Sequence, residues 1–207
     1  MRFFRNTVLS AGASALALLV VPFGGAFAQV APSTDLITED VLGDVREMLA
    51  APIIVQAIRH QNRLREDVQQ AEIDQLDQTW RTEVDFDGAQ PLIAAALGSP
   101  ASTFLLREQA SSKGLYNEIF IMDEHGLNVA QSSVTSDFWQ GDEAKYQNTF
   151  PRGSGAVFVD EPEFNDEFGI WVTQINMTID DNGTPVGVAT IEINLTELDR
   201  RRSNGVL

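Results

Sequence analysis

The sequence contains no cysteine and only two histidines, His60 and His125. A chain without cysteine forms no disulfide, zinc–thiolate site or thiol nucleophile, and carries no lipid-modified cysteine. Two histidines are too few for a histidine-rich metal site. The chain also lacks a nucleophile elbow, a phosphate-binding glycine loop and an HExxH pattern. We therefore assign no catalytic residue and expect neither a cofactor nor a bound metal.

Basic residues are scarce. The chain has 14 Lys and Arg against 30 Asp and Glu, a formal net charge of −16. A field of this sign opposes nucleic acids and anionic membrane surfaces as partners. It also keeps an exported protein soluble, which is the simpler interpretation of the acidity.

The N-terminus has the pattern of an export signal. Arg2 and Arg5 form a basic start, residues 8–21 are apolar apart from small Ser and Gly, and Ala26-Phe27-Ala28 is a small-x-small cleavage pattern. We predict cleavage after Ala28 and a periplasmic or secreted protein. The alternative is a retained anchor, because residues 7–28 carry no charge. Cleavage removes two arginines and no acid, which takes the net charge from −16 to −18.

The next part of the chain has helical character. Apolar residues recur at helical spacing over residues 36–80, and Pro52 predicts a kink or a break within them. Residues 90–97 and 101–110 are two further short amphipathic segments.

After Gly114 the pattern becomes that of strands. We predict five, at residues 118–122, 127–132, 155–161, 169–179 and 186–195, with a hairpin turn at Asp181-Asn182-Gly183. Helices followed by an antiparallel meander indicate an α+β fold whose single sheet carries helices on one side. No second apolar run of membrane length follows the N-terminus, so we expect no transmembrane signalling helix of its own.

The connection at residues 135–150, TSDFWQGDEAKYQNTF, is unusually rich in side chains for a link between strands. We call this segment the crossover. Trp139 and Tyr146 can form an apolar wall and Lys145 a charge for a small carboxylate or amino acid. Alternatively the aromatics only cover the sheet, and Lys145 pairs with Asp142 at the surface. The residue pattern alone favours the second interpretation.

The predicted strands and the acids offer two further candidate sites. Gln174 and Asn176 lie on the polar face of the fourth predicted strand, either lining a pocket or facing water. Asp142 and Asp160 can be cast as a glycosidase pair, but among 30 acids such pairs arise by chance. A hydrolase is therefore the weakest of the hypotheses.

The crossover and its flanks resemble the periplasmic single-Cache (PAS-like, or PDC) sensor domains of bacteria. The motif is a strand ending in M-D-x-x-G, then L-N-V-A-x-S and T-S-D-(Y/F)-W-Q-G-D-E-A-K. These are followed by a strand, a glutamine-bearing strand and a closing hairpin. The matching segments are residues 122–126, 127–132, 135–145, 157–160, 173–174 and 181–187.

The resemblance implies a long N-terminal helix packed on a five- to six-stranded antiparallel PAS/Cache-like sheet. It places a small-molecule pocket under the crossover, for an organic acid, an amino acid or an amine. The pocket or crossover residues it implies are Trp139, Gln140, Asp142, Lys145, Tyr146 and Gln174.

These observations predict four segments: a signal peptide at residues 1–28, a helical segment at 29–69, a Cache-like domain at 70–199 and a tail at 200–207. The predicted function is an exported, non-enzymatic ligand-binding sensor module for signal transduction, which either presents its ligand to a separate membrane receptor or kinase or only binds it. The alternative is a structural protein that forms a homodimer through the helix at residues 36–80, with the sheet as a scaffold.

Overall fold

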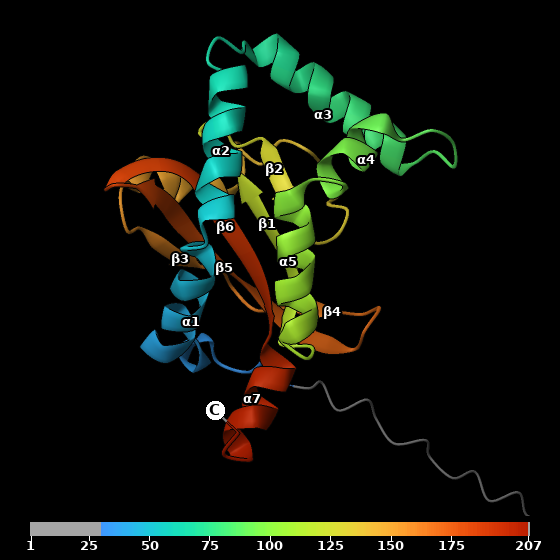
Figure 1. The fold of residues 1–207 in the computed structure, drawn as a ribbon. Coiled ribbons are helices and arrows are strands. Elements are labelled where there is room, and N and C mark those ends of the chain that lie inside the picture. The colour runs from blue at the N-terminus through green and yellow to red at the C-terminus, as the bar shows by residue number, and fades with distance from the viewer. Residues whose placement is uncertain (1–29, 207) are drawn as a thin grey trace, which may run out of the picture. The chain divides into compact units, whose positions relative to one another are not determined.

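The computed structural model describes residues 30–206, so the predicted signal peptide lies outside the described residues. From Ala31 onward the chain forms one compact unit, in which helices pack on an antiparallel sheet (Figure 1). The predicted α+β class is confirmed. The strands are β1 (Tyr116–Met122), β2 (Asn128–Gln131), β3 (Val157–Val159), β4 (Glu163–Asn165), β5 (Ile170–Asp181) and β6 (Thr184–Asn194). Their order is β2-β1-β6-β5-β3, and β4 pairs with β5.

The helical region before the sheet is divided into several helices. They are α1 (Glu39–Leu49), α2 (Pro52–Leu64), α3 (Gln70–Val84), α4 (Pro91–Leu97) and α5 (Pro100–Ser111), preceded by the short 3-10 helix η1 (Thr34–Leu36). Ala51, with φ −57° and ψ 127°, separates α1 from α2. A residue before proline is disfavoured in the helical region, so Pro52 starts a new helix rather than bending one long one.

The main core lies between the helices and one face of the sheet. In Figure 1, α2 and α5 lie side by side across this face. Ile119, Ile191 and Ile175 are paired across β1, β6 and β5, and all three are fully buried in this core. The apolar residues of α1 and α2, such as Val45 and Ile54, belong to the same core. The apolar residues of this helical region that would form the homodimer contact are thus largely buried within this chain. The predicted domain boundary between residues 69 and 70 stays a prediction.

The other face of the sheet is covered by the crossover, which contains α6 (Ala144–Gln147) and leads into η2 (Phe150–Arg152). Here Tyr146 and Phe150 stack on each other, with ring centroids 5.4 Å apart, above Phe120, Met122 and Val188. One face of the sheet therefore supports the fold, and the other carries the segment singled out from the sequence.

The chain continues beyond the sheet as α7 (Leu195–Ser203), which was not predicted. Asn194 caps this helix by accepting a hydrogen bond from the Glu197 N–H at 2.9 Å. Arg200 and Arg201 pair with Glu197 at 2.7 and 2.8 Å. Within residues 30–206, none of the helices combines the length and apolar character needed to span a membrane.

Candidate functional site

A cavity of about 410 Å³ lies between the crossover and the uncovered part of the sheet. Its walls come from three parts of the chain: the start of α6, the segment that links β3 to β4, and the strands β5 and β6. The lining residues are Glu143, Ala144, Lys145, Asp160, Glu161, Pro162, Glu163, Val172, Thr173, Gln174 and Glu192. Five of them are carboxylates and one is a lysine, so the cavity is strongly acidic.

The floor of the cavity includes Asp160, Gln174 and Glu192, which belong to a polar row across the sheet, and Glu118 extends this row beyond the lining residues. Glu192 on β6 pairs with Glu118 on β1 and with Gln174 on β5. The row continues to Asp160, whose N–H donates to the Gln174 carbonyl at 3.0 Å. Side chains alternate between the faces of a strand, so this row lies opposite the neighbouring isoleucine row, which faces the helices. The pairing thus sets four polar residues side by side on the crossover face.

Glu118 is the carboxyl group of this row whose pKa is shifted by its surroundings. Burial of Glu118 raises the pKa of its carboxyl group, and the charge of Glu192 adds to the increase. The hydrogen bond from Ser133 and the charge of Lys145 oppose it. The Asn117 side-chain amide donates to Glu192, and the Ser133 hydroxyl donates to Glu118 at 2.5 Å. Both of these donors are neutral, so among the groups that oppose the raised pKa of Glu118 only Lys145 carries a charge.

Lys145 is committed to partners within the chain. Its Nζ lies 2.9 Å from a Glu143 carboxylate oxygen and donates to Gln140 Oε1 at 3.0 Å. It also lies 5.4 Å from the centroid of the Phe120 ring, within the range of a cation–π contact. With its charge neutralised and its side chain 13% exposed, Lys145 is poorly placed to receive a ligand carboxylate.

The six predicted site residues occupy different places. Lys145 and Gln174 line the cavity, and Gln140 lies behind Lys145, buried and hydrogen-bonded to it. The other three predicted residues are not among the lining residues, and their ligand roles stay predictions.

Each of those three residues has its own position. The Trp139 indole N–H donates to the His125 carbonyl at 2.9 Å, and the Tyr146 hydroxyl donates to the Glu124 carbonyl. Asp142 is exposed. The two aromatics therefore fasten the crossover to the β1–β2 turn. Asp142 and Asp160 do not share the cavity, so the glycosidase pair is not assembled there.

Two carboxylates that line the cavity, Glu143 and Glu192, were not among the predicted site residues. Glu192 lies between Ile191 and Ile193 in an otherwise apolar stretch of strand, which is a signal for a polar site on that face. Its pairing with Gln174 depends on strand register, which no local pattern reveals.

A larger hollow of about 820 Å³ lies at the α2–α3 junction. All of its lining residues fall between Arg63 and Leu76, so one continuous stretch of chain forms it without help from the sheet. Among residues 30–206, no three His, Cys, Asp or Glu side chains are grouped closely enough to hold a metal ion.

Comparisons with known proteins give similarities of fold. No family model matches the chain, and no curated protein matches it. The ligand-binding domain of the Campylobacter jejuni chemoreceptor Tlp3, in complex with 4-methylisoleucine, matches with a TM-score of 0.38 and 15% identity, over 73% of this chain and 64% of that one. The ligand-binding domain of the Pseudomonas aeruginosa amino acid chemoreceptor PctC, in complex with GABA, matches with a TM-score of 0.35 and 15% identity, over 77% and 62%.

The sensor domain of Escherichia coli DcuS matches with a TM-score of 0.44 and 14% identity, over 81% of this chain and 95% of that one. The chain therefore spans less than two thirds of the two chemoreceptor domains and nearly all of the DcuS domain. All three of these matched structures are described as sensor or ligand-binding domains.

Proposed function

We propose that this chain is an exported, non-enzymatic sensor module that binds a small molecule between the crossover and the sheet. One observation carries the proposal: a cavity of about 410 Å³, within the usual range for small-molecule sites, is lined by segments far apart in the sequence. The export signal pattern at residues 1–28 supports a periplasmic or secreted location.

The charge of the cavity selects among the three ligand classes expected from the sequence. An organic acid would meet five carboxylates, and the one lysine is already paired with Glu143. A ligand with a protonated amino group instead gains charge-assisted hydrogen bonds to Glu192 and Asp160. An amine, or an amino acid held by its ammonium group, is thus the favoured ligand.

The mechanism follows from the position of the crossover over the cavity. A ligand that contacts both the floor and Lys145 or Glu143 favours the conformation in which the crossover is closed. The partner that receives this population shift is a separate membrane receptor or kinase. Binding of this kind requires no bond to be made or broken in the ligand.

A thermal-shift screen tests the proposal. We expect 1,4-diaminobutane or γ-aminobutyrate to raise the melting temperature, and succinate to leave it unchanged. At a ligand concentration of about 100 Kd the stabilisation is about 2.7 kcal/mol, or roughly 5–10 °C for a chain of this size. Glu192→Gln removes a floor carboxylate and should abolish the shift, whereas Glu167→Gln, an exposed residue outside the cavity, should preserve it.

Stabilisation by succinate alone would overturn the choice of an ammonium ligand. No response to amines, amino acids or organic acids, with both variants folded, would overturn the binding function. The dimer alternative would then be tested by light scattering on the full mature chain.

A further inference from the structure

Helix α3 is attached to the rest of the unit through the crossover. Trp80 is fully buried, stacks on Phe138 with centroids 5.1 Å apart, and donates its indole N–H to the Thr135 carbonyl at 2.9 Å. These residues belong to a small apolar cluster with Ile73 and Leu127, separate from the main core. The crossover and α3 therefore share buried apolar contacts and a hydrogen bond.

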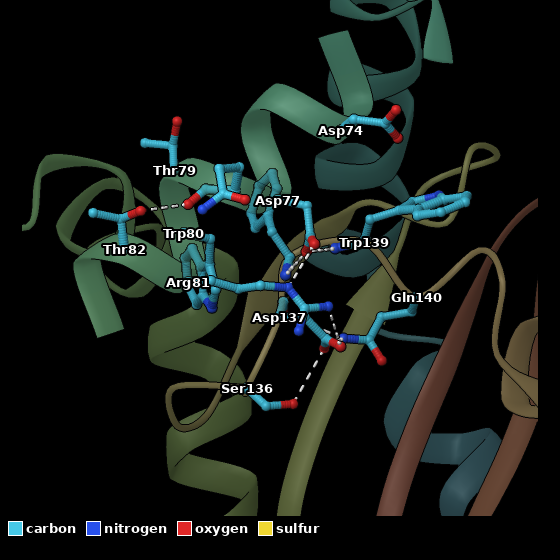
Figure 2. Close-up of polar contacts among 12 residues, drawn as sticks. Asp74, Asp77, Thr79, Trp80, Arg81, Thr82, Ser136, Asp137, Trp139 and Gln140 are labelled. Carbon is cyan, nitrogen blue, oxygen red and sulfur yellow. Dashed lines mark hydrogen bonds and ion pairs between the residues drawn. The ribbon is translucent and has the colours of Figure 1, made fainter. Parts of the chain in front are cut away.

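Asp77 makes the most specific of these attachments, as Figure 2 shows. Its Oδ1 accepts hydrogen bonds from the consecutive N–H groups of Phe138 and Trp139, at 2.9 and 3.1 Å, and its Oδ2 pairs with Arg81 at 2.7 Å. Burial alone would raise the pKa of Asp77. The Arg81 hydrogen bond and the two backbone donors outweigh burial and hold the pKa below its usual value. Asp77 is thus a charged anchor for two adjacent peptide groups.

A chain of polar contacts leads from Asp77 to the cavity. Arg81 also reaches Asp137 at 3.2 Å, and the Asp137 side chain accepts a hydrogen bond from the Gln140 amide (Figure 2). The other end of that amide, Oε1, accepts from Lys145, which pairs with Glu143. An amide that donates at one end and accepts at the other fixes the side chains on both sides of it. The position of Lys145 therefore depends on residues of α3.

From these contacts we infer that Asp77 is a positioning residue of the binding site, although it lies outside the cavity. It holds residues 137–140 in the arrangement that presents Lys145 and Glu143 to the cavity. The inference rests on the proposed function, because it concerns affinity for a ligand bound there. By thermodynamic linkage, a ligand that orders Lys145 also orders α3.

The test compares two Asp→Asn changes on the same helix. Asp77→Asn removes the charge and keeps the size. The control is Asp74→Asn, one turn earlier, where the exposed carboxylate accepts a hydrogen bond only from Gln70, at 2.7 Å. Calorimetric titration with 1,4-diaminobutane should show about ten-fold weaker binding for Asp77→Asn, because the weakened hydrogen bonds to Phe138 and Trp139 no longer hold Lys145 and Glu143 in the arrangement that faces the cavity. Asp74→Asn should bind as the unmodified chain does.

A double-mutant cycle distinguishes positioning from a general loss of stability. If Asp77 acts through Lys145, then Asp77→Asn should have little further effect in a Lys145→Met background. An equal loss in both backgrounds, or unchanged affinity of the single variant, overturns the inference.

Failure of the proposed function has a different signature, namely that the unmodified chain binds none of the probes. Hydrogen exchange then decides the inference without a ligand. The amides of residues 144–147 should exchange faster in Asp77→Asn than in Asp74→Asn. Faster exchange confined to residues 138 and 139 overturns the inference.

Discussion

Glu118 is half-buried on β1 beside a second carboxyl group, Glu192, on the neighbouring strand. Since the folded chain raises the pKa of Glu118, the folded state holds this proton more tightly than the unfolded state does. The contribution of Glu118 to the free energy of unfolding is therefore favourable in acid. It declines as pH rises from the usual glutamate range through the raised pKa.

We predict that Glu118→Gln is more stable than the unmodified chain at about pH 7, and that this advantage disappears towards about pH 4. Glutamine keeps an oxygen that can accept the Ser133 hydrogen bond and removes the repulsion with Glu192. Urea unfolding at several pH values measures the difference. Glu167→Gln, at an exposed position, should show no such trend. An advantage that persists unchanged in acid would contradict the role of the raised pKa.

Part of the candidate site could be predicted from the sequence. Lys145 and Gln174 were predicted from the crossover pattern, strand alternation and the family resemblance, and both line the cavity. The charge balance around Lys145 could not be predicted, because its charge partner Glu143 lies two residues earlier in the irregular crossover, where no local pattern shows that the two side chains meet. Without that partner, a lysine in a pocket predicts a carboxylate ligand, whereas we propose a ligand of the opposite charge.

At the scale of elements, the crossover is packed tightly against the β1–β2 turn. Gly126 has φ +79°, and a Cβ there would lie 2.6 Å from the Gly141 Cα. The Gly126 carbonyl accepts a hydrogen bond from the Gln140 N–H at 2.8 Å, so the two segments are both bonded and in close contact. A glycine is required here by its backbone conformation and by the space available.

Gly126→Ala should therefore destabilise the chain by two separate effects. The left-handed conformation costs roughly 1–2 kcal/mol for alanine, and the steric overlap roughly 1–3 kcal/mol more. Gly155→Ala is the matched control, because Gly155 has φ +72° and a Cβ added there would meet open space. Denaturant unfolding should show the larger loss for Gly126→Ala. Equal losses of unfolding free energy in the two variants would mean that the crossover moves away from the added methyl group without an energetic cost.

Some helices and strands could be predicted from local sequence signals and others could not. The β5–β6 hairpin was predicted from Asn182-Gly183, and both residues have positive φ, as a tight hairpin turn requires. Helix α7 was missed because residues 186–195 were interpreted as a strand and the rest as a tail. Asn194 followed three residues later by Glu197, with arginines in the last turn, is a helix signature that was available. Strand β4 is three residues long and mostly exposed, so its sequence carries no comparable signal.

At the scale of the whole unit, the apolar contacts fall into unequal clusters. The main core joins α1, α2 and α5 to the sheet, whereas α3 and α4 are held by the smaller cluster around Trp80 and Phe138. Segments with fewer buried apolar contacts open at lower free energy than the global unfolding reaction. We therefore expect the part of the molecule that we assign to positioning the crossover to open at a lower free energy than the main core.

We predict from this that native-state hydrogen exchange resolves two levels of stability. The amides of Ile119 and Ile191, in the centre of the sheet, should exchange only through global unfolding, and those of Leu76 and Trp80 through a smaller opening. Trp80→Phe should lower the smaller opening energy, because it removes the hydrogen bond to Thr135 and part of the buried surface, and should change the sheet amides less. Saturating 1,4-diaminobutane should raise the opening energy of α3, because the ligand binds only the closed crossover.

A single opening energy for all four amides would show instead that α3 unfolds with the sheet. The crossover would then have no separate unit through which to act.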